Sequence, residues 1–260
     1  MKNIKTRIYN GETLVGCWLN LGSALTAEIV GMSGFDWVLV DIEHGSGSEG
    51  QVLQQLQALE HTPAASIVRV ESYQRQRFHR ILDFGAEGIM CPRIQTPAEA
   101  RQAVKAIRYP PEGIRGVARM VRATNFGSDF KEYYSNQKKN LVCIVQIETE
   151  EILDSLDSVA AIDGVDVLFV GPMDLSVALG VFGQPDHPKF IDAIRATADA
   201  AIKEGKAAGI LLQKQEEFEK YYELGFRFIA CGSDSGFVKD GACKTVERLN
   251  ELKHSHEAKK

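Results

Sequence analysis

Eight short apolar runs, rich in β-branched and aromatic residues, alternate along the chain with segments whose apolar residues recur at helical spacing. A run of this kind is typical of a parallel strand that is buried on both faces. We expect strands at residues 14–19, 36–41, 66–70, 88–92, 141–147, 165–170, 208–212 and 227–231. Because a helix-like segment separates each strand from the next, the pattern predicts an α/β fold built on a parallel sheet.

The length of the chain favours a closed sheet over an open one. The sequence has 260 residues, and an eight-fold α/β barrel typically has about 250. No linker rich in Pro, Gly or Ser divides it, so we predict a single (β/α)8 TIM barrel over 1–260, with 253–260 as a polar tail. An open doubly wound sheet is the alternative, but no G-x-G-x-x-G follows the first expected strand. We expect helices at residues 24–32, 49–59, 74–82, 97–107, 150–160, 189–204, 215–223 and 238–252.

Composition narrows the class of protein. The formal net charge is −5 without a basic stripe, which argues against nucleic-acid binding. No stretch approaches the roughly 20 apolar residues of a membrane span, and the first ten residues lack a signal-peptide core. The five cysteines are scattered, without a C-x-x-C pair, which is typical of free thiols in a reducing compartment. We therefore expect a cytoplasmic protein with no membrane or nucleic-acid partner.

Four polar signatures stand where apolar runs end: residues 41–44 (DIEH), Arg69, residues 146–148 (QIE) and residues 171–174 (GPMD). Barrel enzymes place their chemistry at the carboxyl ends of the strands. Two carboxylates, one histidine and one arginine arriving in this way predict a single active site centred on a metal ion.

Glu148 and Asp174 are the expected metal ligands. They follow consecutive strands, which are neighbours in a barrel, and two carboxylates suit a hard octahedral ion such as Mg²⁺ or Mn²⁺, with Co²⁺ as a further candidate. Each residue also has a purely structural interpretation. Glu148 could begin the next helix, and Asp174 could be an ordinary N-cap.

His44 and Arg69 are the other two candidates. Asp41 precedes His44 by three residues and could hold its imidazole in one tautomer, which would make His44 a general base near neutral pH. Arg69 could bind a carboxylate or an enolate through paired N–H groups. The structural alternatives are a histidine that only caps a loop, and an arginine that only pairs with a carboxylate at a strand end.

Two further features bear on function. No lysine stands immediately at an expected strand end, and this disfavours an aldolase that forms an imine with its substrate. Residues 109–130 form an unusually long connection, and loops beyond about 12–15 residues are often functional. We expect this connection to be a binding loop at the carboxyl ends of the strands.

With these residues in view, the chain resembles the HpcH/HpaI aldolase family, the metal-dependent class II pyruvate aldolases. The resemblance runs from about residue 16 to residue 232. The segments that carry it are GFDWVLVDIEHG (34–45), IVRV (67–70), RYPPEGIRGVA (108–118), VQIET (145–149), GVDVLFVGPMDLS (164–176) and GQPDHP (183–188).

The resemblance assigns a role to each residue of the four signatures. It implies that Glu148 and Asp174 bind the metal ion. His44 matches the acid/base histidine of the family, and Asp41 matches the aspartate paired with it. Arg69 matches the arginine that binds the pyruvyl group and stabilises the enolate.

Four further residues match family positions. Gln146 corresponds to a glutamine that lines the site, and the amides around Gly171 and Met173 correspond to the segment that receives the substrate carboxylate. The family often has alanine where Met173 stands, so this side chain could narrow the pocket. Asp83 matches an aspartate that a neighbouring subunit contributes to the site.

The resemblance also implies an activity and an assembly. The expected reaction is cleavage of a 2-keto-4-hydroxy acid, such as a 4-hydroxy-2-oxo diacid or a 2-keto-3-deoxy sugar acid, into pyruvate and an aldehyde. A metal–enolate decarboxylase, a C–C bond-forming enzyme like macrophomate synthase, or a non-catalytic barrel that binds keto acids are the alternatives. The family implies a homo-oligomer, a hexamer built as a trimer of dimers, in which the C-terminal helix is exchanged between subunits.

Overall fold

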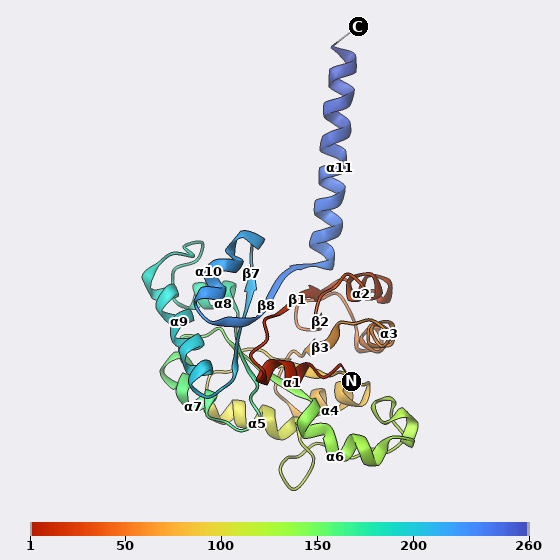
Figure 1. The fold of residues 1–260 in the computed structure, drawn as a ribbon, viewed down its shortest axis with the longest axis vertical. Helices are drawn as coiled ribbons and strands as arrows, with labels where there is room; N and C mark the ends of the chain where they lie inside the picture. Colours follow the sequence, from red (N-terminus) through yellow and green to blue (C-terminus); the bar gives the residue numbers. More distant parts are fainter. Residues whose placement is uncertain (1, 259–260) are drawn as a thin grey trace.

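The eight strands form a closed parallel barrel whose strand order follows the sequence, as the computed structural model shows for residues 2–258 (Figure 1). Pairing of the first strand with the eighth closes the sheet, with Leu14 opposite Phe228, and this excludes the open doubly wound alternative. The predicted TIM barrel is confirmed. The strands are β1 (Leu14–Leu19), β2 (Trp37–Asp41), β3 (Ala65–Arg69), β4 (Gly88–Cys91), β5 (Val142–Ile147), β6 (Val167–Val170), β7 (Ala207–Leu212) and β8 (Phe226–Ser233).

Helices surround the barrel and account for every expected helical segment. Residues 150–160 and 215–223 each divide into a short 3₁₀ turn followed by an α-helix. Three helices were not predicted, namely α1, α6 and α8, because they are short or bury few apolar side chains. The helices are α1 (Ile4–Tyr9), α2 (Ala24–Gly31), α3 (Glu49–Leu59), α4 (Arg75–Asp83), α5 (Pro97–Ile107), η1 (Arg122–Gly127), α6 (Phe130–Asn140), η2 (Leu153–Ser155), α7 (Leu156–Ala160), α8 (Pro172–Ala178), α9 (Pro188–Lys203), η3 (Gln215–Glu217), α10 (Phe218–Glu223) and α11 (Asp234–Glu257).

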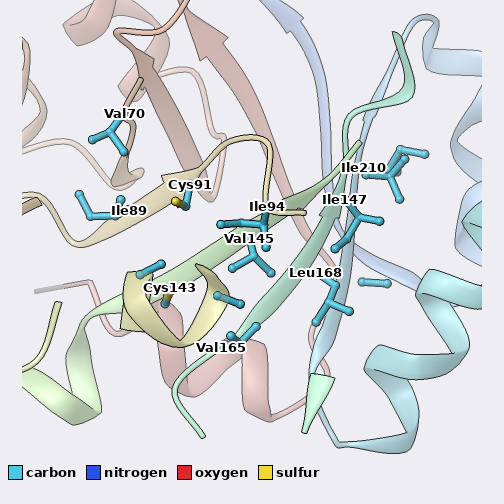
Figure 2. Close-up of a cluster of buried hydrophobic side chains, with 14 of the residues drawn as sticks. Val70, Ile89, Cys91, Ile94, Cys143, Val145, Ile147, Val165, Leu168 and Ile210 are labelled. Atoms are coloured by element: carbon cyan, nitrogen blue, oxygen red, sulfur yellow. The ribbon is translucent and has the colours of Figure 1, made fainter. Parts of the chain in front are cut away.

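Two apolar layers hold the fold together. The larger layer lies between the strands and the helices, and Figure 2 shows the part of it around Cys91, Val145 and Leu168. The smaller layer fills the barrel interior with aromatic rings. Trp37 stacks on Phe228 with ring centroids 4.0 Å apart, so the barrel is a packed core rather than a pore.

The amino end of the barrel is closed by the first helix. Lys5 Nζ on α1 donates to the buried carboxylate of Asp166 at 3.0 Å, and Tyr9 Oη donates to the other oxygen of Asp166 at 2.8 Å. The Cys143 amide donates to Asp166 as well, at 2.8 Å. Because α1 occupies this end, the carboxyl end of the barrel is the end left open for a substrate.

The long connection 109–130 lies at the amino end, so the expected position at the carboxyl ends of the strands is wrong. Helix α5 precedes the connection and carries the chain back to the amino end before it begins. Arg122 Nη1 donates to the Phe84 carbonyl at 2.7 Å, at the carboxyl end of α4, where the chain turns into β4. The helix expected at 97–107 is present as α5, so the loop that follows it begins at the amino end of the barrel.

Helix α11 extends away from the barrel (Figure 1). It runs to Glu257, so residues 253–257, which we expected in a polar tail, are its exposed last turns, while 259–260 lie outside the described residues. Several apolar side chains along it are exposed, among them Val238, Val246 and Leu249. No helix in the described range is long and apolar enough to cross a membrane.

The interior packing predicts the effect of one methyl group. Gly16 on β1 faces the Trp37 ring, and a Cβ added at Gly16 would overlap that ring. Gly16→Ala should lower the free energy of unfolding by about 1–3 kcal/mol, because an overpacked core must shift. Gly241→Ala is the matched control, since nothing lies within 4 Å of that added Cβ. Urea unfolding of the two variants tests the packing, and equal stabilities would contradict it.

Candidate active site

The four polar signatures converge at the carboxyl end of the barrel. Asp41 and Arg69 end the neighbouring strands β2 and β3 and lie opposite each other in register. The other two signatures follow the neighbouring strands β5 and β6, where Ile147 is opposite Val170. The expectation that consecutive strands bring the two carboxylates to one edge is therefore met by the topology.

Arg69 is the centre of a buried ion cluster. Its Nε and Nη2 donate to the two oxygens of Asp41 at 2.9 and 2.6 Å, and its Nη1 lies 3.1 Å from Oε2 of Glu43. The guanidinium also lies 5.9 Å from the centroid of the Trp18 ring, which belongs to the aromatic interior of the barrel. The salt bridge considered as a structural alternative for Arg69 is thus present. A guanidinium has five N–H groups, so donors remain for a ligand.

Asp41 was expected to pair with the His44 imidazole, and the structure shows a different arrangement. Both of its oxygens are bound by Arg69, and Oδ1 also accepts the backbone N–H groups of Glu43 and His44, at 3.1 and 3.3 Å. A bidentate arginine satisfies both carboxylate oxygens, and this leaves Asp41 to hold the backbone of the histidine rather than its ring. The His44 side chain is 69% exposed at the mouth, with its Nε2 3.9 Å from Glu43 Oε2.

Glu43 is the residue of the site that sequence reasoning missed. It stands within the DIEH signature between Asp41 and His44, and no role is predicted for it above. Its carboxylate contacts Arg69 and lies near His44. Burial raises the pKa of Glu43, partly offset by the positive charge of Arg69. The position of the residue just beyond a strand end was the signal that could have identified it.

Glu148 is a buried carboxylate with no cationic partner in the described part of the chain. Its Oε1 accepts the Arg93 backbone N–H at 2.7 Å, and its Oε2 accepts Gln146 Nε2 at 2.9 Å. Among residues 2–258, no side-chain nitrogen of Lys, Arg or His lies within 4.0 Å of its carboxylate. Burial raises the pKa of Glu148 to about 7 against the hydrogen bond from Arg93, and the negative charges of Asp174 and Glu43 contribute to the rise.

Asp174 faces the same site from α8. It lies in the first turn of that helix, whose N-cap is Gly171, so it is not itself the N-cap considered above. No helix begins at Glu148, which removes the structural alternative for that residue. A Cβ added at Gly171 would overlap Glu148 Oε2, so only glycine lets the two signatures approach this closely. Met173 is half-exposed beside them, at 51%.

The donor set fits a hard divalent ion that keeps part of its water. In the part of the chain that the structure describes, no three His, Cys, Asp or Glu side chains converge on one point. Glu148 and Asp174 offer two carboxylates, a number that Mg²⁺ commonly takes from a protein. The buried Gln146 Oε1 accepts no hydrogen bond from any group of residues 2–258, so it could accept one from a bound water or a substrate hydroxyl.

Asp83 is not part of the site of its own chain. It ends α4, which follows β3 and returns to the amino end of the barrel. There it accepts a hydrogen bond from Arg115 Nη2 at 2.8 Å. Arg115 is fully buried, with its guanidinium 4.6 Å from the Tyr109 ring centroid. The expected role of Asp83 in a neighbouring subunit stays a prediction.

Comparison with known proteins shows the family to which this chain is related. The model of the HpcH/HpaI aldolase/citrate lyase family matches residues 14–240. The chain belongs to this family. It is 40% identical to the hydroxypyruvate/pyruvate aldolase of Chromohalobacter salexigens over 240 residues, which cover 92% of this chain and 94% of that protein. It is 39% identical to the 5-keto-4-deoxy-D-glucarate aldolase of Shigella boydii, with 92% and 93% covered.

The solved structures agree with this membership. The crystal structure of an HpcH/HpaI aldolase/citrate lyase family protein from Burkholderia cenocepacia superimposes with a TM-score of 0.92 at 35% identity, covering 96% of this chain and all of that one. The resemblance read from the sequence is confirmed. Because its HpcH/HpaI relatives are named as aldolases, this chain is an enzyme of the carbon–carbon lyase class.

The raised pKa of Glu148 predicts a pH-dependent stability for the metal-free protein. The folded-state pKa of about 7 lies above the ordinary value of 4.5, so ionisation of Glu148 destabilises the folded state. This destabilisation increases as the pH rises from 4.5 and reaches its full size above pH 7. In EDTA at pH 8, the free energy of unfolding of Glu148→Gln should exceed that of the native chain by up to about 3 kcal/mol. Near pH 4.5 the difference should vanish.

Glu150→Gln is the matched control, because Glu150 is an exposed carboxylate two residues further along the chain. It should change the unfolding free energy by less than about 0.5 kcal/mol at either pH. Urea unfolding followed by circular dichroism gives the comparison. A Glu148→Gln variant that is less stable than the native chain at pH 8 would contradict the assigned cost of burial.

Proposed function

We propose that this protein is a divalent-metal-dependent aldolase that cleaves a 2-keto-4-hydroxy acid into pyruvate and an aldehyde, and that also catalyses the reverse addition. The observation that carries the proposal is the pair Glu148 and Asp174, which follow the neighbouring strands β5 and β6, with Glu148 buried and no cationic side chain of residues 2–258 within 4.0 Å of it. The aldolase names of relatives that share about 40% of their residues with this chain support the same reaction class.

Glu148 and Asp174 would hold the metal ion. A carboxylate buried without a cation is costly, and a bound divalent ion would remove that cost. When bound, the ion supplies Lewis-acid polarisation of a carbonyl oxygen. We propose Mg²⁺ or Mn²⁺, with Co²⁺ as a further candidate, because hard ions accept two carboxylates together with water.

Arg69 would bind the pyruvyl group. Its ion pairs with Asp41 and Glu43 fix the plane of the guanidinium, and the remaining N–H groups can donate to the keto acid. As the carbon–carbon bond breaks, negative charge develops on the pyruvyl oxygen. A fixed cation near that oxygen stabilises the charge without reorganising. Gln146 and the backbone amides near Gly171 and Met173 would contact the rest of the keto acid.

His44 would move the proton. It would accept the proton of the 4-hydroxyl group, the C3–C4 bond would break, and its electron pair would pass into the enolate of pyruvate. Protonation at C3 then gives the methyl group of pyruvate, and the former C4 leaves as the aldehyde carbon. The exposure of the His44 ring suits a group that meets substrate at the mouth, with Glu43 near enough to stabilise the imidazolium.

We further propose that the active protein is a homo-oligomer. Helix α11 exposes apolar side chains away from its own barrel, and α2 exposes Leu25 and Ile29, at 71% and 67%. Packing of α11 on the barrel of a second copy would bury both sets. Assembly of such dimers as a hexamer would allow Asp83 to reach a neighbouring site. The free cysteines are consistent with a cytoplasmic location.

The general-base role predicts a large loss of activity in one variant. His44→Ala should lower the retro-aldol kcat by roughly 10²–10⁴-fold, the usual contribution of a general base. Its affinity for Mn²⁺ should stay unchanged, because His44 is not among the proposed ligands. Pyruvate release from 4-hydroxy-2-oxo diacids and 2-keto-3-deoxy sugar acids, followed with lactate dehydrogenase, measures kcat.

His79→Ala is the matched control, since His79 lies on α4 with its Nδ1 3.0 Å from the Arg75 carbonyl oxygen, outside the proposed site. A His44→Ala variant with full retro-aldol activity would disprove the role. Decarboxylation of a keto acid without aldehyde release would favour a metal–enolate decarboxylase. Binding of keto acids with no turnover of any substrate would favour a non-catalytic barrel.

A further inference from the structure

A buried carboxylate at the start of α11 has no role in the proposed reaction. Asp234 is 2% exposed. It accepts hydrogen bonds from the backbone N–H groups of Asn20 and Leu21, at 2.9 and 3.3 Å, and from Thr26 Oγ1 at 2.9 Å. The Ser235 N–H donates to it as well, at 2.9 Å. Two donors from the connection between β1 and α2, and one from α2 itself, therefore fix this part of the chain to the first residue of α11.

That connection in turn holds the segment that carries His44. The Asn20 carbonyl oxygen accepts both the backbone N–H and the hydroxyl of Ser46, at 2.9 and 3.0 Å. Next to these hydrogen bonds the backbones of Gly22 and Gly47 are in contact, since a Cβ added at Gly22 would lie 2.7 Å from the Gly47 Cα. No side chain separates the two loops at this point, so a shift of one backbone must move the other.

His44 thus lies between two anchors of its backbone. On one side Asp41 Oδ1 accepts the His44 N–H, and on the other side Ser46 is bound to Asn20. The imidazole itself is 69% exposed, and its ion-pair contact to Glu43 is long, at 3.9 Å. The position of the ring is therefore set mainly by the backbone that carries it. The Asp41 anchor belongs to the site described above, whereas the second anchor ends at Asp234.

We infer that Asp234 is a positioning residue for the proton-transfer histidine. It fixes the backbone of Asn20 and Leu21, which fixes Ser46 and through it His44. The inference rests on the proposed function, in which His44 is the general base. Because Asp234 is also the first residue of α11, the same carboxylate fixes the start of that helix relative to the mouth of the site.

Kinetics of two variants in two backgrounds test the inference. Asp234→Ala should lower the retro-aldol kcat by about 10–100-fold, because a misplacement of about 1 Å has effects of this size. The Kd for Mn²⁺ should change less than about twofold, since neither proposed ligand touches Asp234. Asp234→Asn keeps one acceptor oxygen and should lose less activity. In the His44→Ala background, Asp234→Ala should lower kcat by no more than about twofold.

A second variant tests the same path where Asp234→Ala fails to fold. Gly47→Ala removes none of the Asp234 hydrogen bonds but places a Cβ 3.1 Å from the Gly22 Cα, so the two loops must move apart by a few tenths of an ångström. It should lower kcat several-fold in the native background and leave kcat unchanged in the His44→Ala background. Gly50→Ala is its matched control, because the nearest atom to that Cβ is Ser48 Oγ, at 3.8 Å.

The outcomes separate this inference from the proposed function. Full activity of Asp234→Ala and Gly47→Ala, beside an inactive His44→Ala, would overturn the positioning role and leave the proposed base intact. A loss that is equally large in the His44→Ala background, or that comes with weaker Mn²⁺ binding, would make Asp234 a general structural residue. Full activity of His44→Ala would overturn both.

Discussion

Glu148 is a carboxylate buried in the mouth of the barrel that no cationic side chain of residues 2–258 neutralises within 4.0 Å. Burial raises its pKa to about 7, and the nearby charges of Asp174 and Glu43 contribute to the rise. Proteins rarely keep a carboxylate in such a place unless another group compensates it. The hydrogen bond from Gln146 holds this carboxylate where a divalent ion could bind it. Gly171 leaves room for it there, because a Cβ at that position would overlap Glu148 Oε2.

Arg69 and Asp41 are satisfied before any substrate arrives. Arg69 is bound by Asp41 and Glu43, so its plane is fixed while donors remain. Asp41 Oδ1, which accepts from Arg69 Nε, also accepts the backbone N–H of His44. The site thus separates into a rigid part, which would bind the metal ion and the keto acid, and an exposed histidine whose position depends on its backbone. The hydrogen bonds that link Asp234 through Asn20 to Ser46 belong to this second part.

Much of this arrangement could be predicted from the sequence, because parallel strands buried on both faces leave a clear apolar pattern. All eight strands were placed within two residues at each end. The strand-end signatures then followed, since residues just beyond neighbouring strands must lie close together. The partner of Asp41 could not be predicted in the same way. Spacing suggested the His44 ring, three residues away, but the choice between that ring and Arg69 is decided by side-chain geometry across two strands.

One error could have been avoided from the sequence, because the helix expected at 97–107 already returns the chain to the amino end of the barrel, whereas the others required the tertiary structure. The connection 109–130 had the length of a functional loop, yet α5 places it at the amino end of the barrel. Asp83 is bound there by Arg115, which lies 32 positions further along the chain, and no local pattern could connect these residues. Helix α8 was missed because it begins inside the signature that supplies Asp174, and its few turns bury little apolar surface.

Pyruvate formation by the EDTA-treated protein, as Mn²⁺ is titrated back, tests the central claim most directly. The native chain should be inactive after EDTA and recover its retro-aldol activity with Mn²⁺, whereas Glu148→Gln should not recover at the same concentrations. Activity that persists after EDTA, or that returns equally in the Glu148→Gln variant, would contradict a metal-dependent aldolase built on this carboxylate.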